Sequence, residues 1–292
     1  MRREADAGAR LQRVPRSGPG ADPIARILRR DVSLSIAVVS GKGGVGKTNL
    51  VVNLAVAMAD MGQRVLLMDG DWGLASVDTL LGLAPRQTLH DVLRGRRRLE
   101  EIVLDGPPGV RVLPASSGIE EMADLDDYRR ETLLRALHDL VQADEVLLID
   151  TGSGVHRQSL RLAQIADEIL VVTTPEPPAF TDAGATLTAL AARRLARHPR
   201  LVVNMTRTPA EGRWAARHVH RLTERSLGFA PELIGVIPAD ETVRRAVREQ
   251  RPFVQIDPDA PASRSVRALA GRLLEAPPSP ARDARAELAR AA

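Results

Sequence analysis

The chain has 292 residues, no cysteine and a formal net charge of +4 at pH 7. Its length suits one large domain, and the missing cysteines exclude disulfides, thiolate metal sites and iron–sulfur clusters. Residues 1–31 carry the whole excess of positive charge, because the rest of the chain has equal numbers of basic and acidic side chains, 33 of each. A surface for specific nucleic-acid binding is therefore not expected.

The first segment, residues 1–31, is rich in Arg, Gly and Pro and has few large apolar side chains. Such a composition predicts a disordered N-terminal segment. No apolar run approaches the ~18 residues of a membrane-spanning helix, and the N-terminus lacks the apolar core of a signal peptide. We therefore expect a cytoplasmic protein.

From Val32 onward, strand-like apolar runs alternate with helical segments. The expected strands are residues 34–40, 64–69, 110–113, 145–150, 168–173, 201–205 and 233–237. Continuous apolar runs separated by helices are typical of a parallel sheet covered on both faces. The sequence therefore predicts an α/β domain over residues 32–276, built on a mostly parallel, twisted sheet, and a flexible tail at 277–292.

Residues 41–48 lie between the first expected strand and a helix expected at 47–60, and they read Gly-Lys-Gly-Gly-Val-Gly-Lys-Thr. This is the Gly-x-x-x-x-Gly-Lys-Thr pattern of a P-loop, whose backbone N–H groups cradle phosphate at the start of a helix. Lys47 is expected to contact the β- and γ-phosphates of ATP, and the Thr48 hydroxyl to bind Mg²⁺. The residues expected around the nucleotide are Gly41, Gly43, Gly44, Val45, Gly46, Lys47, Thr48 and Asn49.

Lys42 and Lys47 are the only lysines among the 41 Lys and Arg residues, and both lie in this loop. Lysine is a compact charge on a thin stem, whereas arginine is a broad planar fork, so the loop has room for the first and not the second. Two alternatives are a dinucleotide-binding G-x-G-x-x-G fingerprint, with Asp69 as its acidic residue, and a chance glycine turn. The Lys-Thr pair directly after the last glycine argues against the fingerprint and favours the P-loop.

Three aspartates lie at or just after the ends of expected strands, at the edge where open parallel sheets bind their ligands. Asp150 ends the run Val-Leu-Leu-Ile-Asp, a Walker B arrangement whose carboxylate holds Mg²⁺, usually through water. The strand at 64–69 ends in Asp69, and Asp71 follows two residues later; both are suited to supporting the metal and orienting the attacking water. The alternative is that each aspartate only caps the next helix.

Lys42, two residues before Gly-Val-Gly-Lys-Thr, and the later segment Asp-Gly-Asp-Trp-Gly-Leu-Ala at 69–75 resemble the deviant Walker A ATPases of the MinD/ParA group. The resemblance covers roughly residues 32–276 and implies a P-loop NTPase fold with weak, partner-stimulated ATPase activity. It also implies a homodimer with ATP between the subunits. Lys42 would then reach the partner's phosphates, Lys47 would bind its own, and Asp71 would activate water. The implied metal site consists of Thr48, Asp69 and Asp150.

Three more residues match positions that frame the adenine in this group: Asn204, at the end of its strand, and Pro238 with Asp240. A strand-end Asn and a Pro-x-Asp cap are also common structural features, so a purely structural role is the alternative for all three. The missing cysteines separate the chain from the metal-cluster carriers of the same superfamily.

Further stretches closely resemble FlhG-type proteins, the MinD relatives that regulate the number and placement of bacterial flagella. They are residues 81–95, 112–118, 150–154 and 174–183. This resemblance implies as partners an FlhF-like GTPase, a flagellar switch protein or a flagellar transcription activator. The alternatives are a MinD-like division-site regulator and a ParA-like DNA-segregation ATPase, and the balanced charge beyond residue 31 argues against the latter.

The chain departs from the FlhG pattern at a few positions. Gly70 replaces an expected Ala and Ser76 an expected Asn, and both changes leave the carboxylates of this segment in place. The short N-terminal segment that activates FlhF is matched only at Ala25, Leu28 and Arg29. Only part of that activating segment is therefore present.

The last expected helix, within residues 261–276, has a one-sided apolar stripe. Its members are Val266, Leu269, Ala270, Leu273 and Leu274, at the i, i+3, i+4, i+7 and i+8 spacing of one helix face. The helix either packs on the sheet as part of the core or makes a peripheral contact with the inner face of an anionic membrane, because its flanks are basic. The stripe is short and lacks Phe and Trp, so we favour the core and expect at most weak, ATP-dependent association with liposomes.

Overall fold

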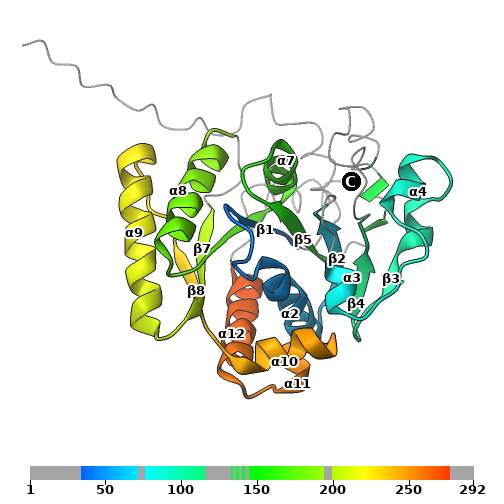
Figure 1. Ribbon diagram of the computed structural model, residues 1–292. Helices are drawn as coiled ribbons and strands as arrows, with labels where there is room; N and C mark the ends of the chain where they lie inside the picture. Colours follow the sequence, from blue (N-terminus) through cyan, green and yellow to red (C-terminus); the bar gives the residue numbers. More distant parts are fainter. Residues whose placement is uncertain are drawn as a thin grey trace, which may run out of the picture.

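Figure 1 shows a computed structural model of the chain, which describes residues 34–71, 76–115, 133, 136–137, 140–141, 145–193 and 199–276. Within these residues, eight strands form one sheet in the order β3-β4-β2-β5-β1-β6-β7-β8. The strands are β1 (Leu34–Ser40), β2 (Arg64–Gly70), β3 (Leu104–Asp105), β4 (Val110–Leu113), β5 (Glu145–Ser153), β6 (Glu168–Thr173), β7 (Arg200–Thr206) and β8 (Leu233–Pro238). The expectations for the segment 1–31 and the tail 277–292 concern residues outside the described ones.

Helices cover both faces of the sheet (Figure 1). The described helices are α2 (Lys47–Asp60), α3 (Val77–Leu80), α4 (Leu89–Leu93), the 3₁₀ helix η1 (Leu99–Ile102), α7 (Arg157–Ile165), α8 (Pro177–Ala191), α9 (Pro209–Leu227), α10 (Glu241–Glu249), α11 (Phe253–Ile256) and α12 (Pro261–Glu275). One face carries α7, α8 and α9, and the other carries α2, α12 and the short helices α10 and α11.

Each face of the sheet has its own hydrophobic core. Along β1, Ala37 and Val39 belong to the core under α7, α8 and α9, whereas Ile36 and Val38 belong to the core under α2 and α12. Successive residues of a strand point to opposite faces, so a strand that is apolar at every position is buried on both sides. This burial explains why the strands appear in the sequence as continuous apolar runs, and the predicted α/β fold with a mostly parallel sheet is confirmed.

All seven expected strands are present, and their ends differ from the expected ones by at most three residues. The sequence did not predict β3, which pairs antiparallel with β4 through Leu104 opposite Val112. This strand has only two residues, partly exposed at the edge of the sheet. It therefore has no apolar run that could distinguish it from a loop.

The last helix, α12, packs against α2 and β8 (Figure 1). Four members of its apolar stripe are buried there: Val266, Leu269, Ala270 and Leu273. The favoured core position is therefore the one observed, and a membrane contact through this stripe would require the helix to leave the core. In the described part of the chain, none of the helices combines the length and hydrophobicity needed to span a bilayer.

The sheet order brings the expected site residues to one edge. β5 lies between β1 and β2, so the P-loop after β1 is next to the carboxyl ends of both neighbours. In the parallel register, Asp69 at the end of β2 is opposite Asp150 in β5. Ligands of open α/β sheets bind at this carboxyl edge.

Candidate functional site

The loop Gly41–Gly46 joins β1 to the N-terminus of α2. Gly44 and Gly46 have φ angles of 82° and 80°, a left-handed conformation that residues with a side chain rarely adopt. Gly46 is the N-cap of α2, and the first turn of that helix contains no acidic residue. Its backbone N–H groups and the positive end of its dipole therefore form an anion site.

Lys47 reaches from the first turn of α2 to β5, where its Nζ lies 2.7 Å from Oδ1 of Asp150. Both side chains are almost fully buried, with exposed fractions of 7% and 1%. A single buried charge without a partner would be unstable in such surroundings, so the ammonium and carboxylate groups stabilise each other's charged form. The structure thus places the Lys47 ammonium group beside Asp150, at the carboxyl edge of the sheet where the P-loop begins.

Asp69 is held at the end of β2 by the backbone that follows it. Its Oδ1 accepts a hydrogen bond from the N–H of Asp71, and its Oδ2 accepts bonds from those of Ser76 and Val77. Burial, together with the nearby charge of Asp150, raises the pKa of Asp69 to about 7. The unperturbed pKa is 3.8. The contribution of this carboxyl group to the stability of the fold is therefore complete below pH 3.8 and is lost as the pH rises through the folded pKa of about 7.

These oxygen atoms fit a Mg²⁺ ion. The Thr48 side chain contributes to lowering the pKa of Asp150, and its hydroxyl lies 3.5 Å from Oγ of Ser76. Oδ2 of Asp150 is buried and has no hydrogen-bond partner among the described residues, and burial raises the pKa of this carboxyl although Lys47 lowers it. A divalent cation that prefers oxygen ligands would give Oδ2 a partner and would stabilise the ionised form of this carboxylate.

Thr48, Asp69 and Asp150 are therefore the residues that would hold Mg²⁺, directly or through water. Bound there, the ion would neutralise the charge that develops on the phosphates during transfer. The described residues contain no cluster of three or more His, Cys, Asp or Glu side chains that forms a metal site alone.

Lys42 occupies a different environment from Lys47. Its Nζ lies 3.8 Å from Oε2 of Glu176, the N-cap of α8, and the two side chains are 45% and 69% exposed. An ion pair this exposed contributes little to stability. The sequence did not identify Glu176, because only the neighbouring positions of β1 and β6 bring it near the P-loop.

Asn204 supports the P-loop from β7. Its Nδ2 donates a 2.9 Å hydrogen bond to the carbonyl oxygen of Val45, a buried residue of the loop. A Cβ added to Gly46 would lie 2.5 Å from the same Nδ2. The next residue, Met205, has a φ of 56° and is 42% exposed. A strained residue beside the loop fits a functional edge of the sheet.

The other two expected adenine contacts have structural roles in this fold. Pro238 ends β8, and Asp240 is the N-cap of α10. Its Oδ1 accepts a 2.9 Å hydrogen bond from the N–H of Thr242, and its Oδ2 accepts a 3.1 Å bond from that of Ala262. Asp240 thus ties the start of α10 to α12, which is the capping role given above as the alternative.

The substitution Gly41→Ala is expected to destabilise the fold by about 2 kcal/mol or more, as overpacking against fixed atoms does. A Cβ on Gly41 would lie 2.4 Å from the carbonyl oxygen of Asp182 and 2.5 Å from its carbon. These are backbone atoms of α8, so they have no rotamer that avoids the contact. Gly43→Ala is the matched control, because its Cβ would meet only Oγ of Ser153, at 3.7 Å. Equal denaturant midpoints for the two variants would contradict this close approach.

Residues 31–274 match the ParA family model, described as "NUBPL iron-transfer P-loop NTPase". Iron transfer is not carried over to this chain, because it has no cysteine. Among curated relatives, antiactivator FleN from Pseudomonas aeruginosa is 42% identical over 238 residues, which cover 82% of this chain and 85% of FleN. Flagellum site-determining protein YlxH from Helicobacter pylori is 29% identical over 240 residues, covering 82% of this chain and 81% of YlxH.

A solved structure of similar fold is septum site-determining protein MinD from Pyrococcus horikoshii OT3, complexed with Mg-ADP. It is 29% identical, covers 82% of this chain and 95% of its own, and superposes with a TM-score of 0.68. The family model spans more than half of the chain, and the FleN match spans more than two thirds of both sequences. The site agrees with these matches, because it has a P-loop, a buried lysine and adjoining carboxylates. The chain therefore belongs to the ParA family of P-loop NTPases, among relatives of the FleN, YlxH and MinD type.

Proposed function

We propose that this protein is an ATP-dependent, dimerising molecular switch that regulates the number or placement of flagella. The observation that carries the proposal is the 42% identity to FleN over most of both chains. The match to a flagellum site-determining protein supports the same process. A MinD-like role at the division site is the second candidate, supported by the shared fold at 29% identity.

In this proposal the site hydrolyses ATP slowly, and the bound nucleotide sets the state of the switch. The N–H groups of the P-loop and Lys47 bind the β- and γ-phosphates. Thr48, Asp69 and Asp150 would hold Mg²⁺, and Asp71 orients the attacking water. The buried ion pair of Lys47 and Asp150 supports this assignment, because it keeps the cation beside the metal position.

Dimerisation would place ATP between two copies, with Lys42 reaching the phosphates of the partner. Lys42 is suited to this role because its ion pair with Glu176 is long, at 3.8 Å, and exposed to solvent. A second subunit could therefore replace that contact at small energetic cost. The ATPase domain in this proposal spans residues 32–276, between two terminal extensions.

Partners follow from the proposed process. The name of the relative FleN, an antiactivator, supports a flagellar transcription activator as one partner. An FlhF-like GTPase and a flagellar switch protein are the other two candidates. ParA-like binding of DNA is disfavoured, because residues 32–292 carry no net charge.

Electron microscopy of cells depleted of the protein tests the proposed process directly. A changed number or position of flagella with normal cell length is the expected result. Complementation with the wild-type gene should restore the normal pattern, and complementation with a Lys47→Ala variant should not. Normal flagella together with minicells or filaments would favour the division-site candidate and contradict the flagellar one.

A further inference from the structure

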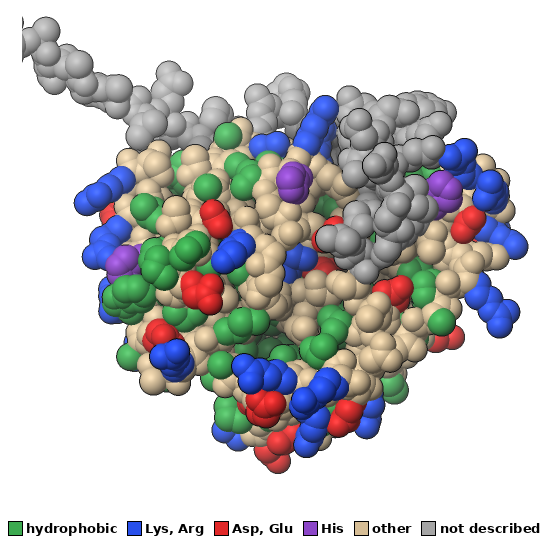
Figure 2. All heavy atoms as spheres, viewed as in Figure 1, with side chains coloured by type: hydrophobic (Ala, Val, Ile, Leu, Met, Phe, Trp, Pro, Cys, Tyr) green, Lys and Arg blue, Asp and Glu red, His purple; other side chains and the backbone are tan. Residues whose placement is uncertain are grey.

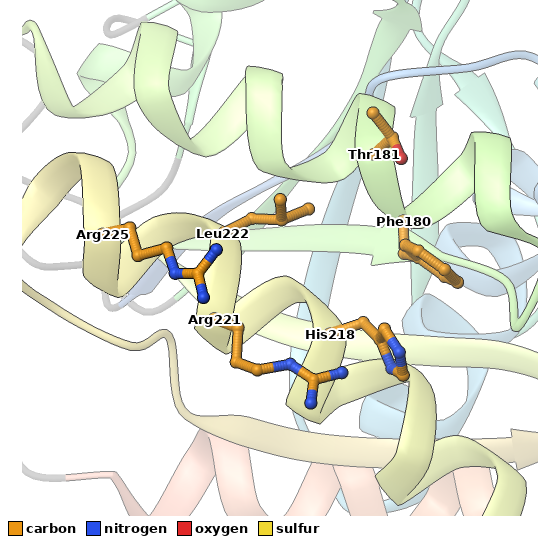
Figure 3. A pocket seen from close by; sticks show the side chains of 6 residues that line it. All are labelled: Phe180, Thr181, His218, Arg221, Leu222 and Arg225. Carbon is orange, nitrogen blue, oxygen red and sulfur yellow. The ribbon is translucent and has the colours of Figure 1, made fainter.

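A pocket of about 300 Å³ opens on the surface between α8 and α9 (Figure 3). It is lined by Phe180, Thr181, His218, Arg221, Leu222 and Arg225. Phe180 and Thr181 come from α8, and the other four come from α9. The floor is apolar, whereas two guanidinium groups stand at the rim.

The pocket adjoins a cluster of aromatic rings in a chain that has few of them. Only six Phe, Trp and Tyr residues occur in the whole sequence, and two of these meet here with a histidine. The centroids of Phe180 and Trp214 are 5.8 Å apart at 78°, and that of His218 lies 4.1 Å from Trp214. Trp214 is 40% exposed and Leu222 is 42% exposed. Large apolar groups at the surface of such a chain indicate a contact site.

Two parallel stripes run along the exposed side of α9. The first stripe has two large apolar side chains with a histidine between them, Trp214, His218 and Leu222, and the second is basic, with Arg213, Arg217, Arg221 and Arg225. Both repeat every four residues, so each follows one side of the helix. All four arginines are exposed, and none forms a salt bridge with another described residue. Figure 2 shows hydrophobic and basic side chains next to one another over this region, at the left of the molecule.

We propose that this surface binds a protein segment with one aromatic or large aliphatic side chain flanked by carboxylates. The apolar side chain would enter the pocket and cover Phe180, which is itself 8% exposed. The flanking carboxylates would pair with Arg221 and Arg225 at the rim, as bidentate guanidinium contacts allow. The inference rests on the pocket and its charges, and it does not depend on the proposed role in flagella.

Two other classes of partner fit the surface less well. A nucleic acid would use the arginines but would leave the recessed apolar floor without a contact. A bilayer would favour protruding apolar side chains rather than a pocket that must receive one. A peptide uses both features, because interface hot spots combine a buried apolar anchor with a charged rim.

The pocket is also connected to the nucleotide site through α8. Glu176 at the start of this helix is the partner of Lys42, and the carbonyl oxygen of Asp182 packs against Gly41 of the P-loop. Phe180 and Thr181 lie between these two contacts in the sequence. A ligand that moves α8 would therefore change the contacts of this helix with Lys42 and Gly41 in the P-loop.

The test begins with the selection of random displayed peptides that bind the full-length chain. The most strongly enriched peptide is then synthesised, and its binding is measured by ¹⁹F NMR of protein labelled with 5-fluorotryptophan. The chain has two tryptophans, Trp72 and Trp214, so the spectrum contains only two signals to distinguish. We expect enriched peptides to share an apolar anchor between acidic residues and to shift the Trp214 resonance. A Trp214→Phe variant assigns that resonance.

Three variants separate the pocket from the general charge of the protein. The variant Leu222→Ser should weaken peptide binding about tenfold, and the double variant Arg221→Gln with Arg225→Gln about fivefold, as expected for an anchor contact and two rim pairs. The double variant Arg244→Gln with Arg248→Gln removes two exposed arginines from α10 and should leave binding unchanged. Thermal unfolding of each variant confirms that it is folded.

The proposal is overturned if no peptide is enriched, or if the enriched peptides lack the acidic and apolar signature. It is also overturned if the pocket variants bind the enriched peptides as tightly as the wild type does. Duplex DNA of random sequence, vesicles containing phosphatidylglycerol and increased protein concentration are tested in the same assay. A Trp214 shift with one of these and none with peptide would assign the surface to nucleic acid, membrane or a second copy instead.

Discussion

The variant Lys47→Ala is expected to lose ATP binding by about 100-fold or more, because two charge-assisted contacts to phosphate disappear. It should also destabilise the fold by about 3 kcal/mol, since it leaves the buried carboxylate of Asp150 without its partner. Burial already raises the pKa of Asp150, and losing the cation raises it further, so the destabilisation should shrink as pH falls. Isothermal titration with Mg-ATP and denaturant unfolding measure the two effects.

A second substitution separates binding from stability. Adding Asp150→Asn to Lys47→Ala removes the unpaired charge, so the free energy of unfolding should recover in large part. Binding of ATP should not recover, because neither substitution restores a cation at the phosphates. Recovery of both would contradict the role of Lys47 as the phosphate ligand, and recovery of neither would show that its packing matters more than its charge.

The fold was predictable because each central strand is buried on both faces and therefore appears as a continuous apolar run. The strands at 34–40 and 168–173 were predicted at their observed bounds for this reason. The strand β3 at Leu104–Asp105 was not predicted, because two partly exposed residues at a sheet edge carry no periodic signal. The helix α12 was ambiguous, since an amphipathic stripe describes both a core helix and a membrane-surface helix.

Local motifs were enough to propose the residues of the candidate site, but not to predict the contacts between them. The sequence indicates that Lys47 and Asp150 both serve the nucleotide, yet the 2.7 Å ion pair between them depends on the order of β1 and β5 in the sheet. The hydrogen bond from Asn204 to the P-loop likewise joins segments far apart in the sequence. Such contacts arise from tertiary packing, which residue patterns within one element do not encode.

The two lysines illustrate the same distinction. Their shared loop and the scarcity of lysine in the chain indicate that both are needed. The structure separates them, because Lys47 is 7% exposed and neutralised by a buried carboxylate, whereas Lys42 is 45% exposed beside a solvated one. One lysine is therefore fixed within its own subunit, and the other is free to respond to a second subunit, as the proposed dimer requires.

Asp71 is the residue whose replacement should affect turnover without affecting binding. Its backbone is fixed by the hydrogen bond that its N–H donates to Asp69. Its side chain lies beside the end of β5, since a Cβ added to Gly152 would be 3.5 Å from Oδ1 of Asp71. Together with burial, the charge of Asp71 raises the pKa of Asp150, so Asp71 is close enough to act electrostatically on the proposed metal site. Replacing Asp71 leaves Lys47 and the P-loop unchanged.

We therefore expect Asp71→Ala to bind ATP and dimerise as the wild type does, and to hydrolyse it about 100-fold more slowly, as loss of a group that orients or deprotonates water does. Asp71→Asn should be similarly slow, because an amide keeps the shape but is not a base. Single-turnover phosphate release measures hydrolysis, and equilibrium titration with gel filtration measures binding and dimerisation. The control is Asp78→Ala, which removes a carboxylate from nearby α3. Full turnover by Asp71→Ala would assign water activation to another group, whereas weakened binding would make Asp71 a ligand of the nucleotide or its metal.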